Sequence, residues 1–138
     1  MNLAAILIML AWVSANTPNL GTLVVSTIFG EGVQKHLRIV QNYVVANDQM
    51  TAFEYQKTGA FKRFNTGQYL SINGAGRLVI SKIPHRGFSL SRSEQSDFKK
   101  FVSYKGRYLF ELCGDGRIGF QSHCKGAREV SLTFAEVF

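Results

Sequence analysis

The feature that most constrains this chain is an internal repeat. Most of the segment GQYLSINGAGRLVIS, from Gly67 to Ser81, recurs 39 to 40 residues later as GRYLFELCGDGRIGF, from Gly106 to Phe120. Each copy has a Gly-x-Tyr-Leu run, a Gly-x-Gly-Arg stretch and a second apolar run. A repeat of this size is typical of supersecondary units that must pack on one another to bury their apolar faces.

The centre of each copy predicts a β-hairpin. Asn73 to Gly76 and Gly114 to Gly116 supply residues that tolerate positive φ, and each turn lies between two β-rich runs. Turn residues of this kind between short apolar segments are the sequence signature of a hairpin.

The whole chain reads as all-β. Its 138 residues are 46% hydrophobic and include only 2 prolines, which favours one folded domain over a disordered chain. The 11 Phe and 5 Tyr residues lie in short runs with Val, Ile and Thr that are separated by Gly, Asn, Asp and Ser. Such runs are typical of strands, and no convincing helical period is present.

The spacing of these runs predicts twelve strands in three similar units. The expected strands are 23–29, 36–40, 43–45, 51–55, 59–64, the two runs of the first copy, 88–90, 98–104, the two runs of the second copy, and 130–137. We therefore expect residues 23–138 to form a closed β-trefoil of three four-stranded units with pseudo-three-fold symmetry.

The N-terminal segment MNLAAILIMLAWVSA, residues 1–15, predicts a secretion signal. It is the one long apolar run, and it ends in small residues that suit cleavage after Ala15. The alternatives are a first strand or a transmembrane segment, but the run is short for a bilayer. We expect a secreted, extracellular protein with a flexible lead-in at residues 16–22.

Several segments, read in order, resemble a fibroblast growth factor. They are His36–Ile39, Phe64–Ser81, Phe98–Ser103, Arg107–Leu112 and Val130–Phe134. The resemblance implies a β-trefoil and a secreted mitogenic ligand of a receptor tyrosine kinase, with heparan sulfate or heparin as co-ligand. It also implies a monomer until glycosaminoglycan bridges two copies. The small size and loose motif suggest a divergent invertebrate or viral member.

The resemblance implies a glycosaminoglycan site in the last hairpin and the following loop. The residues in these positions are Arg117, Gln121, Lys125 and Arg128. Sulfate groups are held by charge and by guanidinium hydrogen bonds, so such a site needs converging basic side chains. Two acids in the segment predict weaker heparin binding than in a typical relative. A solvated basic surface remains the alternative, since the chain carries a net charge of +7. Three other basic pairs could equally be solvent-facing strand residues: Lys62 and Arg63, Lys99 and Lys100, and Lys105 and Arg107.

The resemblance also implies a receptor-binding set, which falls on Phe29, Phe98, Ala135 and Val137. Exposed aromatic side chains are effective interface anchors because they dominate binding energy in desolvated patches. For Phe29 and Phe98, core packing is the alternative.

Nothing in the sequence indicates an enzyme. The three histidines are scattered, and neither a catalytic triad pattern nor a metal-binding Cys or His spacing is present. We therefore expect no cofactor, no metal, no nucleic-acid partner and no membrane insertion. The second functional hypothesis is a secreted β-trefoil binding module, such as a lectin or a protease inhibitor, without receptor signalling.

Cys113 and Cys124 could form a disulfide in an oxidising compartment. An extended strand would place Cys124 about 20 Å beyond the hairpin, at about 3.3 Å per residue. A loop that folds back would bring the two sulfurs together. The disulfide and a pair of free thiols therefore both remain open.

Overall fold

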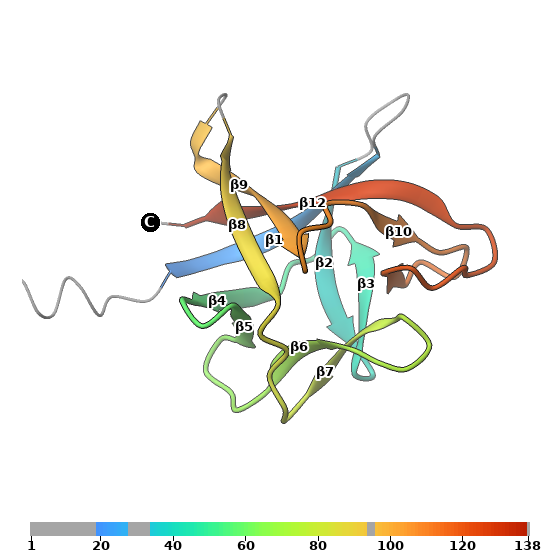
Figure 1. The fold of residues 1–138 in the computed structure, drawn as a ribbon, viewed down its shortest axis with the longest axis horizontal. Helices are drawn as coiled ribbons and strands as arrows, with labels where there is room; N and C mark the ends of the chain where they lie inside the picture. The colour runs from blue at the N-terminus through green and yellow to red at the C-terminus, as the bar shows by residue number, and fades with distance from the viewer. Residues whose placement is uncertain (1–18, 28–33, 94–95, 138) are drawn as a thin grey trace, which may run out of the picture.

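The protein is all-β, as the sequence predicts (Figure 1). The computed structural model describes residues 19–27, 34–93 and 96–137, and none of these is helical. The strands are β1 (Asn19–Thr27), β2 (Lys35–Val40), β3 (Tyr43–Asn47), β4 (Ala52–Gln56), β5 (Ala60–Arg63), β6 (Tyr69–Ile72), β7 (Leu78–Ser81), β8 (Phe88–Ser93), β9 (Ser96–Tyr104), β10 (Phe110–Leu112), β11 (Ile118–Gly119) and β12 (Arg128–Glu136). Within the same residues there is no helix able to cross a membrane.

Seven strands close into an antiparallel barrel in the order β1-β2-β3-β7-β6-β5-β4, with β4 returning to β1. The long first strand makes this closure possible. Asn19–Thr22 pair with β4, Val24 and Val25 pair with β2, and Gly21–Thr27 pair with β12 on the other edge. A closed ring leaves no free edge among its own strands.

The prediction of a β-trefoil of three four-stranded units is wrong. The other five strands, β8 to β12, lie outside the ring, and their longest pairing with it joins β12 to β1. The barrel also crosses the boundaries of the expected units, because Tyr43 on β3 pairs with Val79 on β7. The repeat specifies how each hairpin turns, whereas cross-strand register decides which hairpins pair, and the repeat does not encode that register.

The predicted hairpins themselves are confirmed. In β6–β7 the Asn73 N–H donates to the Arg77 carbonyl at 2.9 Å, and in β10–β11 the Cys113 N–H donates to the Arg117 carbonyl at the same distance. Gly76 and Gly116 take the equivalent positive φ values of 78° and 84°. Left-handed backbone is cheap only for glycine, which explains the shared Gly-Arg signature.

The predictions for the N-terminal segment fall partly outside the described residues. The expected signal peptide at 1–15 and Phe29 in the first strand both lie there, and nothing is known of their structure. β1 begins at Asn19, inside the expected flexible lead-in 16–22, and it ends at Thr27. The Asn19–Thr22 end is ordered because it pairs with β4.

An aromatic cluster fills the core. The Phe61 ring lies 5.1 Å from Tyr55 and 5.4 Å from both Phe88 and Phe134, measured between centroids. These tilted and edge-on arrangements are the favourable ones for aromatic pairs. Phe61, Phe88 and Phe134 are almost completely buried, and full burial stabilises the fold by about 1.5–3 kcal/mol for each such side chain.

Three hairpins meet at one end of the barrel and position the candidate site. β3 contacts β7 through Tyr43 and Val79, the β6–β7 turn contacts β11 through Arg77 and Gly119, and the β10–β11 turn contacts β3 through Arg117 and Val45. Main-chain hydrogen bonds hold these contacts, including the 2.9 Å bond from the Ala46 N–H to the Gly116 carbonyl. Residues 113–124 are therefore anchored on two other hairpins.

Candidate functional site

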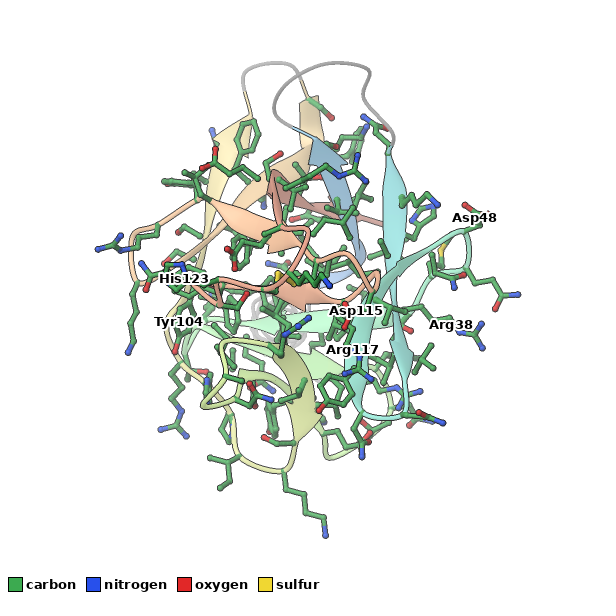
Figure 2. All side chains as sticks on the ribbon, turned by 90° about the vertical axis from the view of Figure 1, so that its right-hand side faces the viewer. Arg38, Asp48, Tyr104, Asp115, Arg117 and His123 are labelled. Atoms are coloured by element: carbon green, nitrogen blue, oxygen red, sulfur yellow. A yellow bond between two sulfur atoms is a disulfide. The ribbon has the colours of Figure 1, made fainter. Side chains whose placement is uncertain are left out.

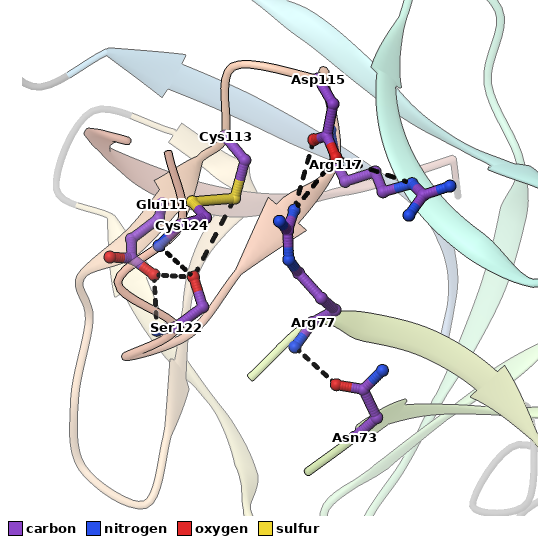
Figure 3. Close-up of a disulfide and its surroundings, with 8 residues drawn as sticks. All are labelled: Asn73, Arg77, Glu111, Cys113, Asp115, Arg117, Ser122 and Cys124. Atoms are coloured by element: carbon purple, nitrogen blue, oxygen red, sulfur yellow. Dashed lines mark hydrogen bonds and ion pairs between the residues drawn. A yellow bond between two sulfur atoms is a disulfide. The ribbon is translucent and has the colours of Figure 1, made fainter. Parts of the chain in front are cut away.

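A disulfide joins Cys113 to Cys124, with the two Cα atoms 5.7 Å apart (Figure 3). Gln121 and His123 reverse the chain, because both adopt left-handed φ values, 51° and 54°. Beside the disulfide, the Gly114 N–H donates to the Lys125 carbonyl at 2.9 Å. The loop after β11 therefore folds back onto the β10–β11 turn.

Glu111 secures the same loop from the other side. Its Oε1 accepts hydrogen bonds from the Ser122 N–H at 2.7 Å and the Ser122 hydroxyl at 2.5 Å. Gly119 leaves room for this contact, since a Cβ there would lie 3.0 Å from Glu111 Oε1 and even closer to Ser122 Oγ. Glu111 therefore has a structural role in holding the loop.

Asp115 is the centre of a charged cluster between two hairpins. Its Oδ1 lies 3.3 Å from Arg77 Nη1, and its Oδ2 lies 3.9 Å from Arg117 Nε. The Arg117 N–H also donates to Asp115 Oδ1 at 3.0 Å. This backbone hydrogen bond, together with the two guanidinium groups, lowers the pKa of Asp115. Figure 3 shows the carboxylate between the two arginine side chains.

Arg117 also stacks on an aromatic ring from the barrel. Its Cζ lies 3.7 Å from the centroid of the Tyr43 ring on β3. A guanidinium over an aromatic face is attracted by the ring quadrupole, and the partial burial strengthens this attraction. The Arg117 guanidinium therefore contacts both the Tyr43 ring and the Asp115 carboxylate. These two contacts fix its position and pair its charge within the protein.

Gln121 contacts a different arginine. With its amide oxygen facing Arg107, that oxygen accepts hydrogen bonds from Nη1 at 2.9 Å and from Nε at 3.3 Å. This is the amide orientation in which both groups find suitable partners, and it is assigned from the hydrogen-bond network. Gln121 therefore orients Arg107 without neutralising it.

Arg107 is positioned by a tight turn between β9 and β10. Tyr104 and Arg107 exchange main-chain hydrogen bonds of 2.9 and 3.0 Å. Lys105 and Gly106 at the tip have φ values of 49° and 79°. Two successive left-handed residues are the signature of a two-residue hairpin turn of type I′. The turn projects Lys105 and Arg107 from one short segment.

Lys105 packs against the segment around Gly87. Its Nζ lies 5.5 Å from the centroid of the Tyr104 ring, and its N–H donates to the Gly87 carbonyl at 2.9 Å. A Cβ on Gly87 would lie 2.9 Å from the Tyr104 ring and 3.1 Å from Lys105 Cγ. The absence of a side chain at Gly87 lets the lysine stem lie along this surface.

The structure does not gather the four predicted glycan residues into one set. Arg117 is directed to Tyr43 and Asp115, whereas Gln121 is directed to Arg107. Lys125 and Arg128 are exposed, and neither forms an ion pair with any residue that the structure describes. In Figure 2, Asp115 and Arg117 lie near the centre of the view, and Tyr104 and His123 lie to their left.

Three of the four predicted receptor residues lie at the same end of the β9–β12 pair, but Phe98 points to the opposite face from Ala135, because Ala135 is opposite Lys99 and successive strand residues alternate between faces. β9 pairs with β12 so that Lys99 is opposite Ala135, which places Phe98 next to the end of β12. Val137 follows β12 directly, and its N–H donates to the Leu20 carbonyl at 3.0 Å. The side chains of Phe98 and Val137 are 64% and 51% exposed. Phe98 is therefore a surface residue and not part of the core.

The sequence did not predict the partner residues that separate the role of Arg117 from that of Arg107. Tyr43 and Arg77 lie far from Arg117 and Asp115 in the sequence, and no local pattern marks them as partners. Arg107 had one local signal, the Lys105-Gly106 pair that suits a tight turn. Over residues 19–27, 34–93 and 96–137, no group of three His, Cys, Asp or Glu side chains could hold a metal ion.

Comparison with known proteins adds no relative. No protein-family model matches the sequence, and no curated protein or solved structure matches it at the significance required.

Proposed function

We propose that this chain is a secreted ligand of the fibroblast-growth-factor type that binds and activates a receptor tyrosine kinase, with heparan sulfate as co-ligand. The observation that carries the proposal is the exposure of Phe98 and Val137, which lie at the same end of the β9–β12 pair as the half-buried Ala135. The resemblance assigns these three residues to the receptor. Exposed apolar side chains at one end of a sheet are suited to anchoring a protein interface.

Two further features support this proposal. The Cys113–Cys124 disulfide is compatible with an oxidising, extracellular compartment. The net charge of +7 and the exposed Lys125 and Arg128 favour an anionic co-ligand. Because Arg117 is held by Asp115 and Tyr43, we assign glycan contact to Lys125 and Arg128 and give Arg117 a structural role.

Receptor phosphorylation on responsive cells tests the proposal. Purified protein with heparin should stimulate phosphorylation of a fibroblast growth factor receptor, and Phe98→Ala should weaken receptor binding by about 2 kcal/mol, or about 30-fold. The matched control is Phe64→Ala, which removes another exposed phenylalanine from a different part of the surface. Both variants should unfold like the wild type, since neither side chain is buried.

Two results would contradict the proposal. If no receptor of this class binds or is phosphorylated, the signalling role fails, and a secreted binding module such as a lectin or protease inhibitor becomes the better hypothesis. If Phe98→Ala and Phe64→Ala weaken receptor binding equally, the assigned contact surface is wrong.

A further inference from the structure

Arg107 differs from Arg77 and Arg117, the other two arginines near the disulfide, in the charge of its partner. Arg77 and Arg117 share the carboxylate of Asp115, which offsets one of their two positive charges. Arg107 is held by the amide of Gln121, which orients a guanidinium but carries no charge. Among the residues that the structure describes, no acid pairs with Arg107 or with Lys105.

We propose that Arg107, Gln121 and Lys105 form a sulfate-binding subsite for a sulfated glycosaminoglycan. Lys105 and Arg107 lie on the β9–β10 turn, outside the positions that the sequence resemblance indicates, whereas Gln121 is one of those positions. The inference rests on the proposed glycan co-ligand and names where one of its sulfate groups binds. The three residues are called the Arg107 subsite below.

The donors of Arg107 suit this role. A guanidinium has five N–H donors, and the contacts with Gln121 involve Nε and Nη1. No described residue accepts a hydrogen bond from Nη2, so this end of the group can donate to a sulfate. Because Gln121 has already ordered the side chain, sulfate binding costs less conformational entropy than binding to a mobile arginine.

Lys105 adds a second cation from the same turn. Its backbone is fixed by the left-handed turn and by the hydrogen bond to the Gly87 carbonyl. Its stem packs near Gly87 and its ammonium lies against the Tyr104 ring, while the residue as a whole remains exposed. An ordered guanidinium and an ammonium on one short turn favour a fully ionised sulfate, because each cation can make a charge-assisted contact with it.

The backbone geometry of two loops brings the subsite together. Gln121 has a left-handed φ of 51°, and the Phe120 N–H before it donates to the Gly76 carbonyl at 2.7 Å. After it, Glu111 and the disulfide fix Ser122 and Cys124. Gln121 is therefore held on both sides in a conformation that directs its amide towards the β9–β10 turn.

Heparin affinity of matched double variants tests the Arg107 subsite. Lys105→Ala with Arg107→Ala lowers the net charge from +7 to +5, and so does Arg38→Ala with Lys57→Ala, which removes exposed residues that form no ion pair within the described chain. We expect the first pair to weaken heparin binding about tenfold more than the second, because charge-assisted hydrogen bonds are lost. Equal weakening would overturn the inference.

A variant that keeps the charge tests the orienting role of Gln121. Gln121→Leu leaves +7 unchanged but removes the acceptor for Arg107. It should lower the salt concentration at which the protein elutes from heparin, and it should have less effect on elution from a sulfonate cation-exchange resin. Unchanged heparin elution with a native thermal unfolding curve would contradict the role assigned to Gln121.

The outcomes separate this inference from the proposed function. If Lys125→Ala with Arg128→Ala weakens heparin binding more than the control pair but the Arg107 variants do not, the co-ligand stands and the Arg107 subsite is wrong. If the wild type elutes from heparin and from the sulfonate resin at the same salt, both the co-ligand and the subsite fail. On O-desulfated heparin, the Arg107 and control variants should differ much less in affinity than they do on heparin.

Discussion

Two arginine clusters contact the segment closed by the Cys113–Cys124 disulfide, and they use the arginine side chain in opposite ways. In the Asp115 cluster, Arg77 and Arg117 share one carboxylate and join separate hairpins. In the Arg107 subsite, a neutral amide orients the guanidinium and leaves its charge uncompensated. The contrast indicates that the partner of an arginine, and not its exposure alone, separates structural from binding roles.

The two guanidinium groups differ in which contacts they would lose on binding a sulfate and in whether a carboxylate already pairs with them. A guanidinium that stacks on Tyr43 and faces Asp115 would have to give up both contacts to bind a sulfate. A guanidinium held by Gln121 can keep its contact and add the sulfate. We therefore expect substitutions in the Asp115 cluster to change stability, and substitutions in the Arg107 subsite to change binding.

The largest expected effect comes from the disulfide that connects the two regions. Replacing both Cys113 and Cys124 by Ala should lower the free energy of unfolding by about 3 kcal/mol, which is the loop-closure estimate for a separation of 11 residues. Urea denaturation measures this. Heparin binding should also weaken, because the disulfide holds the loop that carries Gln121.

Reduction of the wild-type protein provides the matched comparison for the cysteine variant. Reductant should reproduce both effects in the wild type and change nothing in the double alanine variant. If the double variant unfolds at the wild-type urea concentration and still binds heparin normally, the disulfide does not organise either region.

The next effect is the coupling between Arg117 and Tyr43. In a double-mutant cycle with Arg117→Leu and Tyr43→Leu, the two residues should show a coupling energy of about 0.5–1 kcal/mol in unfolding. Such a value would support a stacked guanidinium at 3.7 Å from the ring centroid. A coupling energy of zero would mean that Arg117 is free, and the contrast with Arg107 would be lost.

The smallest effect is the pH dependence due to Asp115. Its pKa is lowered from 3.8, chiefly by the backbone hydrogen bond from Arg117, so its contribution is present above pH 3.8 and is lost as pH falls through the lower folded-state value. The carboxylate is half-exposed, so we expect only a few tenths of a kcal/mol. Asp115→Asn should remove this acid-dependent component, measured by thermal unfolding across the acid range.

Asp48→Asn is the control for that measurement. Asp48 is exposed and forms no ion pair within the described residues, and its substitution changes the net charge equally. If the two variants have the same acid-dependent stability profile, Asp115 has no special contribution.

The sequence predicted the local structure well because local residues determine it. Gly76 and Gly116 mark the hairpin turns, and the runs around them become paired strands. The closed barrel could not be predicted in this way. Its closure depends on which residues of β1 pair with β4 and on the contact between β3 and β7, and both pairings join segments that are distant in sequence.

The candidate site shows the same division. Gln121 and the two cysteines could be named from the sequence, but the chain reversal at Gln121 and His123 uses left-handed residues without a glycine signal. Arg117 was predicted as a sulfate ligand from the resemblance, and the sequence could not show its stacking partner Tyr43, which comes from another hairpin. The sequence left open whether Arg107 binds a partner or only faces solvent, because its orienting amide lies in a loop that only the tertiary structure brings near.

The most direct test of the contrast measures two single variants, Arg107→Ala and Arg117→Ala, for both unfolding free energy and heparin affinity. Each removes one positive charge. We predict that Arg107→Ala weakens heparin binding about tenfold with less than about 0.5 kcal/mol of destabilisation, whereas Arg117→Ala costs about 1 kcal/mol of stability and leaves heparin affinity close to that of the wild type. The opposite pattern, or equal losses of heparin affinity in the two variants, would contradict the account.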